Sequence, residues 1–472
     1  MAHRLRWALA PTDRRAKAAV LLGALPFGAA LAAVVALADG GLVAAVAAGL
    51  AGSALVLAGA AWLLAPRTDP GTSVRVETVR AAERPLDLRV AESAPPRANI
   101  VLPIIDLPHF FGGYLGLFNL ARRLTDRGIR VRLVTVHPQP RLPADWRERL
   151  ERYEGLAGAS ERIEVEFARD AGRPLEVSPR DTFLATSAWT ARVAHQASRA
   201  VGRERFVHLI QDYDPLTFPN GSMAAIGREA YGLPHRAVFS TQPLADFFRL
   251  RRLGVFAAGD AEGTRDSVVF RSAITPVGPV TERELASRPA RALLFYARPE
   301  EHAARNMFEL GFVALCEAAT AGVFEGDWRF AGIGTVKPLP GLELPGGRRL
   351  ELLPRTGQRE YAATLGQFSV GMALMDTPHP SLVPLEMAAA GMAAVTSTFA
   401  NKDAATLRAI SPNLIPAAPS VEGVVEALRE AVRRAGDLSG RARGSEIDWP
   451  RSWDAALDDE VVARVAGWLD PA

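Results

Sequence analysis

The sequence of 472 residues contains a single cysteine, Cys316, in the apolar run MFELGFVALCEAAT. One cysteine can form neither an internal disulfide nor a cysteine-based metal site, and it favours a reducing compartment. The eight histidines show no His-x-x-x-His pair or other ligand spacing. We therefore expect no bound metal and no cofactor.

The chain also has no large excess of positive or negative charge, because 55 basic and 52 acidic residues leave a formal net charge of only +3. That balance gives no indication of nucleic-acid binding. The chain also lacks the G-x-G-x-x-G run that marks a dinucleotide site. Its composition, 49% apolar and 23% charged, is typical of a globular protein, and its length predicts two or three domains.

The N-terminus has two uncharged runs, 21 residues at 18–38 and 26 residues at 40–65. Each can cross a hydrocarbon core about 30 Å thick, which needs roughly 20 residues. Basic residues precede the first run and follow the second, which places both ends in the cytoplasm. We predict a membrane hairpin over 1–66, with helices at 18–38 and 41–65, in the cytoplasmic membrane and with the catalytic domains in the cytoplasm. A cleaved signal peptide would explain the first run but not the second.

The rest of the chain predicts an α/β protein with two Rossmann-like domains. Residues 67–97, rich in Pro, Arg and Glu, read as a linker. Apolar runs typical of buried parallel strands then alternate with helix-like stretches. In the first domain, 98–288, strands are expected at 98–106, 129–136, 181–186, 205–210, 236–240 and 267–270. In the second, 289–455, they are expected at 291–299, 328–334, 348–354, 369–375 and 393–398. A C-terminal helix follows at 456–472, and a ligand cleft is expected between the facing domains.

Two groups of residues suit phosphate. Gly112 and Gly113 follow the first strand and begin a helix, where backbone N–H groups and the helix dipole favour an anion; a plain tight turn is the alternative. Arg298 ends a strand and Arg305 precedes the next helix, so both can face a diphosphate, unless they are ordinary surface arginines. Lys337 can add a third cation.

The stretch TPHPSLVPLEMAAAG contains one carboxylate, Glu386, at the start of an apolar helix. Such a carboxylate can accept hydrogen bonds from vicinal ribose hydroxyls, or it can serve only the helix dipole. Three prolines stiffen the loop before it, which carries His379 and Ser381.

In LIQDYDP, a strand ends in Asp212, Tyr213 and Asp214, which face the expected cleft. Paired carboxylates there can do acid/base work, hydrogen-bond sugar hydroxyls, or cap the next loop. The run HFFGGYLGLF contains His109 and several aromatic side chains, which are more often core than site residues.

The motifs IVLPIIDLPHFFGG, TSAWTA, LIQDYDP, FPNGS, FYARP, RNMFELG, TPHPSLVPLEMAAAG and FANKD occur in this order. As an ordered set they resemble the GT-B glycosyltransferases, and more closely the WsaF-like rhamnosyltransferase family, which is related to retaining glycosyltransferase family 4. The resemblance runs from about residue 100 to the C-terminus. Where the wider retaining group commonly has Gly-Phe-Gly, this chain has His379-Pro380-Ser381, and Pro378 replaces that group's upstream glutamate.

The resemblance implies two facing Rossmann-like domains, with a nucleotide-sugar bound mainly by the second. It implies that Arg298 and Arg305 bind the diphosphate, that Glu386 binds the nucleotide ribose, and that Gly112 and Gly113 lie by the phosphates. Together with the candidates from the residues themselves, the expected catalytic residues are Arg298, Arg305, Asp212 and His379. The expected donor side comprises Glu386, Gly112, Gly113, Lys337, Ser381 and Leu385, and the expected acceptor side His109, Tyr213 and Asp214.

The expected activity is transfer of L-rhamnose or another deoxyhexose to a growing cell-surface or lipid-linked glycan. The donor is expected to be dTDP-L-rhamnose or another nucleoside-diphosphate sugar, and the reaction is expected to need no metal and to retain the anomeric configuration. Two alternatives remain open. One is a nucleotide-sugar 2-epimerase on the same scaffold, and the other is a non-catalytic scaffold protein in a polysaccharide-assembly complex.

Overall fold

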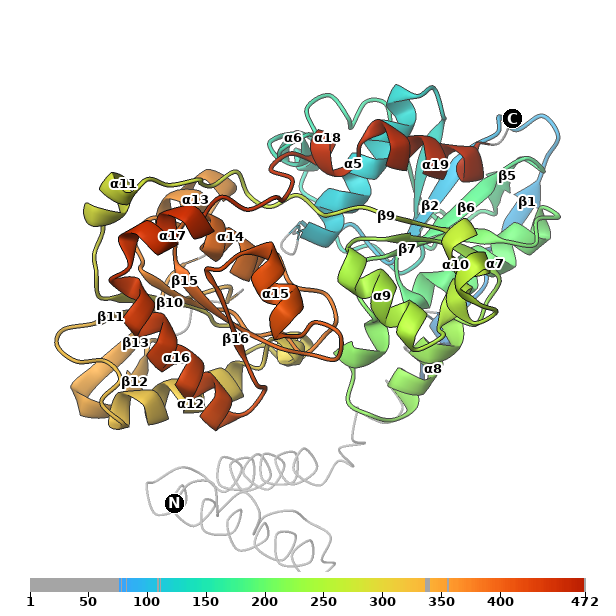
Figure 1. The fold of residues 1–472 in the computed structure, drawn as a ribbon. Helices are drawn as coiled ribbons and strands as arrows, with labels where there is room; N and C mark the ends of the chain where they lie inside the picture. Colours follow the sequence, from blue (N-terminus) through green and yellow to red (C-terminus); the bar gives the residue numbers. More distant parts are fainter. Residues whose placement is uncertain are drawn as a thin grey trace, which may run out of the picture. The chain divides into compact units, whose positions relative to one another are not determined.

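The computed structural model describes residues 76–77, 79–81, 83–107, 110, 112–335, 340–354 and 356–470. The predicted membrane hairpin therefore lies outside the described residues, as do His109 and Lys337. Among the helices that are described, none combines the length and the apolar character needed to span a bilayer. Residues 81–472 form one compact unit with two large sheets, and Figure 1 shows the order of its elements.

The first sheet has seven parallel strands in the order β4-β3-β2-β6-β7-β8-β9. They are β2 (Ala98–Leu102), β3 (Val131–Thr135), β4 (Glu164–Phe167), β6 (Thr182–Ala185), β7 (Phe206–Ile210), β8 (His235–Phe239) and β9 (Ser267–Val269). The helices of this half are α5 (Gly112–Asp126), α6 (Trp146–Glu151), α7 (Ala188–Ala200), α8 (Ser222–Ala230), α9 (Gln242–Leu250) and α10 (Asp260–Arg265).

The second sheet also has seven strands, in the order β12-β13-β11-β10-β14-β15-β16, and only β12 runs antiparallel. They are β10 (Ala292–Tyr296), β11 (Arg329–Ile333), β12 (Leu342–Leu344), β13 (Arg348–Leu352), β14 (Val370–Met372), β15 (Ala393–Ser397) and β16 (Leu414–Ala417). The helices are α11 (Glu282–Ala286), α12 (Phe308–Thr320), α13 (Gln358–Leu365), α14 (Val383–Ala389), α15 (Ala404–Ile410), α16 (Val421–Ala435) and α17 (Leu438–Gly444).

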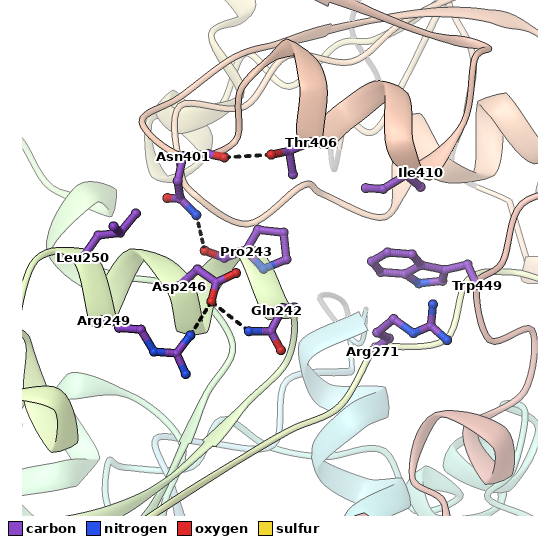
Figure 2. A pocket seen from close by; sticks show the side chains of 10 residues that line it. All are labelled: Gln242, Pro243, Asp246, Arg249, Leu250, Arg271, Asn401, Thr406, Ile410 and Trp449. Atoms are coloured by element: carbon purple, nitrogen blue, oxygen red, sulfur yellow. Dashed lines mark hydrogen bonds and ion pairs between the residues drawn. The ribbon is translucent and has the colours of Figure 1, made fainter. Parts of the chain in front are cut away.

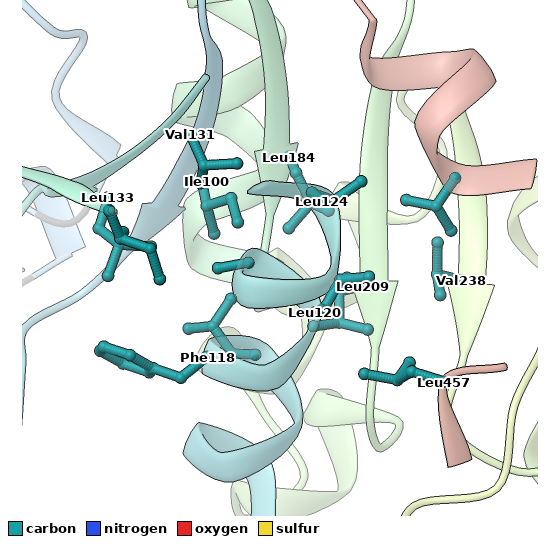
Figure 3. Packing of buried hydrophobic residues seen from close by; sticks show 14 of the residues in the cluster. Ile100, Phe118, Leu120, Leu124, Val131, Leu133, Leu184, Leu209, Val238 and Leu457 are labelled. Carbon is teal, nitrogen blue, oxygen red and sulfur yellow. The ribbon is translucent and has the colours of Figure 1, made fainter. Parts of the chain in front are cut away.

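The central strands, among them β2, β3, β6, β7, β14 and β15, are buried on both faces, which explains why they read as largely apolar runs. In β2, Ile100 packs under α5 while its neighbour Val101 points to the opposite core, with α7 and α9. Figure 3 shows Leu120 and Leu124 of α5 among side chains of the central strands. Burying a large aliphatic side chain contributes about 1.5–3 kcal/mol, so this packing holds α5 against the first sheet.

The two C-terminal helices, α18 (Trp453–Ala456) and α19 (Asp459–Leu469), return to the first sheet. Trp453, Leu457 and Val462 are buried in the same core as α5. Residues from 453 on therefore belong to the N-terminal domain's core. The sequence predicted the helix but placed residues up to 455 in the second domain, because amphipathicity shows that a helix is covered and not which sheet covers it.

The chain thus passes between the two sheets twice, at 270–281 and at 445–452, and the two passages are bonded to each other. The Ile274 N–H donates to the Pro450 carbonyl at 3.0 Å, and the Trp449 indole N–H donates to the Ser272 carbonyl at 2.8 Å. The Arg451 guanidinium reaches the Val277 carbonyl at 3.1 Å.

The predicted linker at 67–97 differs from the structure at its end. Strand β1 (Leu88–Val90) pairs in parallel with β5 (Leu175–Val177) as a separate small sheet. A three-residue strand with exposed side chains has no apolar run that would reveal it in the sequence.

Candidate active site

A cavity of 790 Å³ lies between the two sheets, at the carboxyl ends of their strands. Ligands bind at this end of open α/β sheets. Nine of the residues singled out from the sequence line it: Gly112, Gly113, Asp212, Asp214, Arg298, Arg305, His379, Ser381 and Glu386.

Two other predicted residues do not line the cavity. Tyr213 packs into the core of the first domain, against the rings of Tyr231, Phe247 and Phe248. Leu385 is fully buried in the core of the second domain. Tyr213 lies between Asp212 and Asp214, and Leu385 precedes Glu386; the three acidic residues all line the cavity. Neighbouring side chains at a strand end or on a helix point in different directions, so Tyr213 and Leu385 face the core instead.

The two arginines are held loosely by carboxylates. The Nε of Arg298 lies 3.8 Å from Glu300, and the Nε of Arg305 lies 3.6 Å from Asp212 on the other domain. These distances are too long for hydrogen bonds, and both Nε groups are buried without a hydrogen-bond partner. A bound anion would supply what these N–H groups lack.

Glycines allow close approach at two points of the wall. A Cβ on Gly112, at the start of α5, would lie 3.1 Å from the side chain of Leu382 on the opposite domain. Gly334 follows β11 with a φ of +106°, and a Cβ there would lie 3.0 Å from Cγ of Arg298. Larger residues at either position would push on the elements that frame the cavity.

Glu386 is buried, and each of its carboxylate oxygens accepts a hydrogen bond from a different part of the second half of the chain. The Thr275 N–H, in the first passage between the sheets, donates at 2.8 Å, and the Tyr361 hydroxyl donates at 2.7 Å. Burial raises the pKa of Glu386, and the two donors oppose that rise. The Thr275 side chain also lowers this pKa by hydrogen bonding, so the carboxylate keeps acceptor capacity for at most about one further donor from the cavity.

His379 is held as a neutral donor. Its Nδ1 accepts the Ser381 N–H at 3.0 Å, and burial lowers its pKa to about 4. The proton of the neutral ring is therefore on Nε2. Ser381 has a φ of +63°, a left-handed conformation that costs a non-glycine residue about 1–2 kcal/mol.

Asp214 lies beside Asp212 at the end of β7. The N–H of Ala188, the first residue of α7, donates to its carboxylate at 2.6 Å. Burial raises the pKa of Asp214 to about 6; the Ala188 N–H lowers it, the Asp212 charge raises it further, and Arg305 lowers it.

This pKa predicts a pH-dependent effect of Asp214→Asn on stability. The folded protein binds the Asp214 proton more tightly than the unfolded chain does, because the pKa of this carboxyl in the unfolded chain is the ordinary 3.8. The wild type therefore loses stability from this group as pH rises from about 4 through 6. Asparagine stays neutral and keeps an acceptor for Ala188, so the variant should gain about 3 kcal/mol at pH 8 and less than about 1 kcal/mol at pH 4. Urea unfolding at both pH values measures this, and an equal gain at both would contradict it.

Several residues that line the cavity were not predicted from the sequence. Tyr361 and Thr275 hold Glu386, Gln211 donates to the Gly113 carbonyl at 3.0 Å, and Trp453 arrives from the C-terminal helices. Across the described part of the chain, no three His, Cys, Asp or Glu side chains gather in a way that could hold a metal ion.

Comparison with protein families identifies the chain. A family model described as the WsaF N-terminal domain matches residues 97–242, and one described as the WsaF C-terminal domain matches residues 291–429. Together they cover more than half of the chain. The chain belongs to the WsaF family. Its two matched regions correspond to the two sheets, so the predicted WsaF-like, GT-B-like α/β fold with parallel-sheet Rossmann-like domains is confirmed.

This WsaF-family chain is also similar to two individual proteins. The O-antigen biosynthesis protein RfbC of Myxococcus xanthus is 30% identical over 388 residues, which are 77% of this chain and 27% of that protein. The chain thus matches about a quarter of the relative's length. The structure of Anabaena Alr3699/HepE in complex with UDP and glucose is 11% identical, with a TM-score of 0.50, over 79% of this chain and 98% of that one. At this identity the likeness concerns the fold alone.

Proposed function

We propose that this chain is a glycosyltransferase that moves a sugar from a nucleoside-diphosphate donor to a growing cell-surface or lipid-linked glycan. The observation that carries the proposal is the cavity itself. It unites two buried guanidinium Nε groups without hydrogen-bond partners, the N-terminus of α5, and the buried carboxylate of Glu386, which keeps acceptor capacity toward the cavity. These are the groups that a diphosphate and a ribose need.

Arg298, Arg305 and the N-terminus of α5 stabilise the charge that develops on the departing nucleoside diphosphate. Because these groups supply positive charge, the proposed reaction needs no bound metal. His379 offers an Nε2–H beside the sugar or diphosphate, and Asp212 and Asp214 lie on the acceptor domain. The anomeric configuration is retained, by attack on the same face within the ion pair.

The donor in this proposal carries L-rhamnose or another deoxyhexose, with dTDP-L-rhamnose as the first choice. Family membership and the O-antigen relative support a polysaccharide product. A membrane hairpin at 1–66 would keep the catalytic domains at the cytoplasmic face of the inner membrane, beside a lipid-linked acceptor.

A panel of nucleotide sugars, incubated with and without membrane lipid extract, tests the proposal. We expect release of nucleoside diphosphate that depends on the acceptor, fastest with the dTDP-deoxyhexose. Isomerisation of the donor without acceptor would instead indicate the 2-epimerase. Absence of both turnover and donor binding would indicate the non-catalytic scaffold protein.

A further inference from the structure

The LIQDYDP motif contains a polar residue, Gln211, to which the proposed function gives no role. Gln211 directly follows β7 and lines the cavity. Its backbone is fixed, because the Ser240 hydroxyl donates to the Gln211 carbonyl at 3.2 Å and the Ser240 N–H donates to the Ile210 carbonyl at 3.0 Å. The side chain therefore starts from a well-held point at the carboxyl end of the first sheet.

The side-chain amide of Gln211 is bonded to the first turn of α5. Its Nε2 donates to the Gly113 carbonyl at 3.0 Å. Gly113 is the second residue of α5, so its peptide group belongs to the helix end whose N–H groups have no partner within the helix. A hydrogen bond to this carbonyl polarises the peptide group, which makes the N–H of Tyr114 on its other side a better donor.

The glycines of α5 make room for this amide. A Cβ on Gly113 would lie 3.7 Å from Nε2 of Gln211, in ordinary contact. A Cβ on Gly116 would lie only 3.2 Å from Oε1 of Gln211 and 3.3 Å from the ring of Trp453. The two glycines are three residues apart, which places them on one face of the helix. The start of α5 is thus packed closely against both Gln211 and Trp453.

The same strand end also reaches the second domain, through the residue that follows Gln211. Oδ2 of Asp212 lies 3.6 Å from Nε of Arg305. The start of α5 approaches the second domain as well, since a Cβ on Gly112 would lie 3.1 Å from the side chain of Leu382. The end of β7 therefore lies beside two groups that are proposed to bind the diphosphate, the N-terminus of α5 and Arg305.

We propose that Gln211 is a positioning residue, which holds the N-terminus of α5 where its N–H groups meet the diphosphate of a donor. This inference rests on the proposed function for the identity of the anion. Gln211 acts through the helix and does not touch the donor. Without its amide the first turn of α5 frays, as helix ends do. The anion then has to order this turn when it binds, which weakens binding.

The first arm of the test needs no donor. Gln211→Met keeps the length of the side chain and removes the N–H donor. Hydrogen exchange at residues 116–118 should become several-fold faster, because their N–H groups bond to the carbonyls of the first turn. Thermal unfolding should stay close to that of the wild type. Unchanged exchange at 116–118 would overturn the positioning role, and Gln211→Ala serves in the same way if Gln211→Met does not fold.

Gln242→Met is the matched control. Gln242 is a glutamine of the same domain, at the start of α9, and its amide donates to the Asp246 carboxylate at 2.8 Å (Figure 2). It lines a different pocket from the one that holds Gln211. The same substitution at this position should leave both the exchange of α5 and the binding of nucleotides unchanged.

The second arm compares nucleoside diphosphates with nucleosides. By calorimetry, Gln211→Met should weaken UDP and dTDP about tenfold, the scale of one hydrogen bond. Ligand-observed NMR should show unchanged affinity for uridine and thymidine, because a nucleoside has no phosphate for α5 to bind. Gln211→Glu places a carboxylate where the diphosphate has to approach, so it should weaken UDP and dTDP further and again spare the nucleosides.

Two outcomes of this arm would overturn the proposal. Equal losses for nucleosides and nucleoside diphosphates would mean that Gln211 contacts the nucleoside or supports the fold in general. Wild-type affinity for UDP and dTDP in a folded Gln211→Met variant would mean that its hydrogen bond does not position α5 for the anion. If the wild type binds neither diphosphate, the proposed function fails, whereas hydrogen exchange still decides whether Gln211 fixes the start of α5.

Discussion

Replacing Arg298 by alanine is expected to weaken nucleoside-diphosphate binding by about 100- to 1000-fold. Its guanidinium is mostly buried at the cavity wall, and its Nε has no hydrogen-bond partner. Removing one partner of a buried charge pair costs about 2–5 kcal/mol, because the other charge is left unpaired. Calorimetric titration with UDP and dTDP measures the loss.

Arg429→Ala is a suitable control, since Arg429 lies exposed on α16. It should bind both nucleotides as the wild type does. Thermal unfolding of the Arg298 variant should stay close to wild type, because the contacts of Arg298 with Glu300 and His302 are local and peripheral to the core. If a folded Arg298→Ala variant bound both nucleotides with wild-type affinity, Arg298 would not be part of the diphosphate site.

Glu386→Ala is expected to lower both donor affinity, by about 100-fold, and stability. Alanine leaves the Thr275 N–H and the Tyr361 hydroxyl without their acceptor, and each unsatisfied buried group costs about 1–3 kcal/mol. Glu386→Gln keeps the shape and one acceptor oxygen, so it should fold normally. Its donor affinity should still fall, because a hydrogen bond to a charged group is worth about 1.5–3 kcal/mol.

The nucleotide itself can show what Glu386 binds. A ribonucleotide presents 2′- and 3′-hydroxyls, whereas dTDP and dUDP present only the 3′-hydroxyl. If Glu386 accepts from the ribose, Glu386→Gln should weaken UDP more than dUDP, with the base unchanged. Equal losses for the two nucleotides would exclude a contact of Glu386 with the 2′-hydroxyl, and no loss for either would place the sugar of the nucleotide elsewhere. The comparison also indicates whether the site favours a dTDP-type donor.

The buried strands of both sheets could be predicted because their two covered faces make them continuous apolar runs. All eleven predicted strands have a counterpart within a few residues of the expected limits. The strands missed among the described residues are β1, β4, β5, β12 and β16, which lie at sheet edges or in the small sheet. Edge strands have fewer covered residues, so their sequences read as loops.

The site could be predicted where chemistry follows directly from position at a strand end or helix start. Arg298, Arg305 and Glu386 are of this kind, and the cavity brings them together. Their partners could not be predicted, because Thr275 and Tyr361 are distant in sequence and reach Glu386 only through the packing of the second sheet. Gln211 lies in the LIQDYDP motif, but nothing in the sequence indicates that its amide reaches α5.

The double passage of the chain between the sheets has a practical consequence. A protease that cuts within 273–281 would leave two fragments with no covalent link, but residues 453–470 of the second fragment would still pack in the core of the first. The Trp449–Ser272 hydrogen bond would also help to hold the two fragments together. Neither half can be produced alone by truncating the chain at a single position. The first half, produced by itself, needs residues 453–470 grafted onto its end, since Trp453 and Leu457 complete its core.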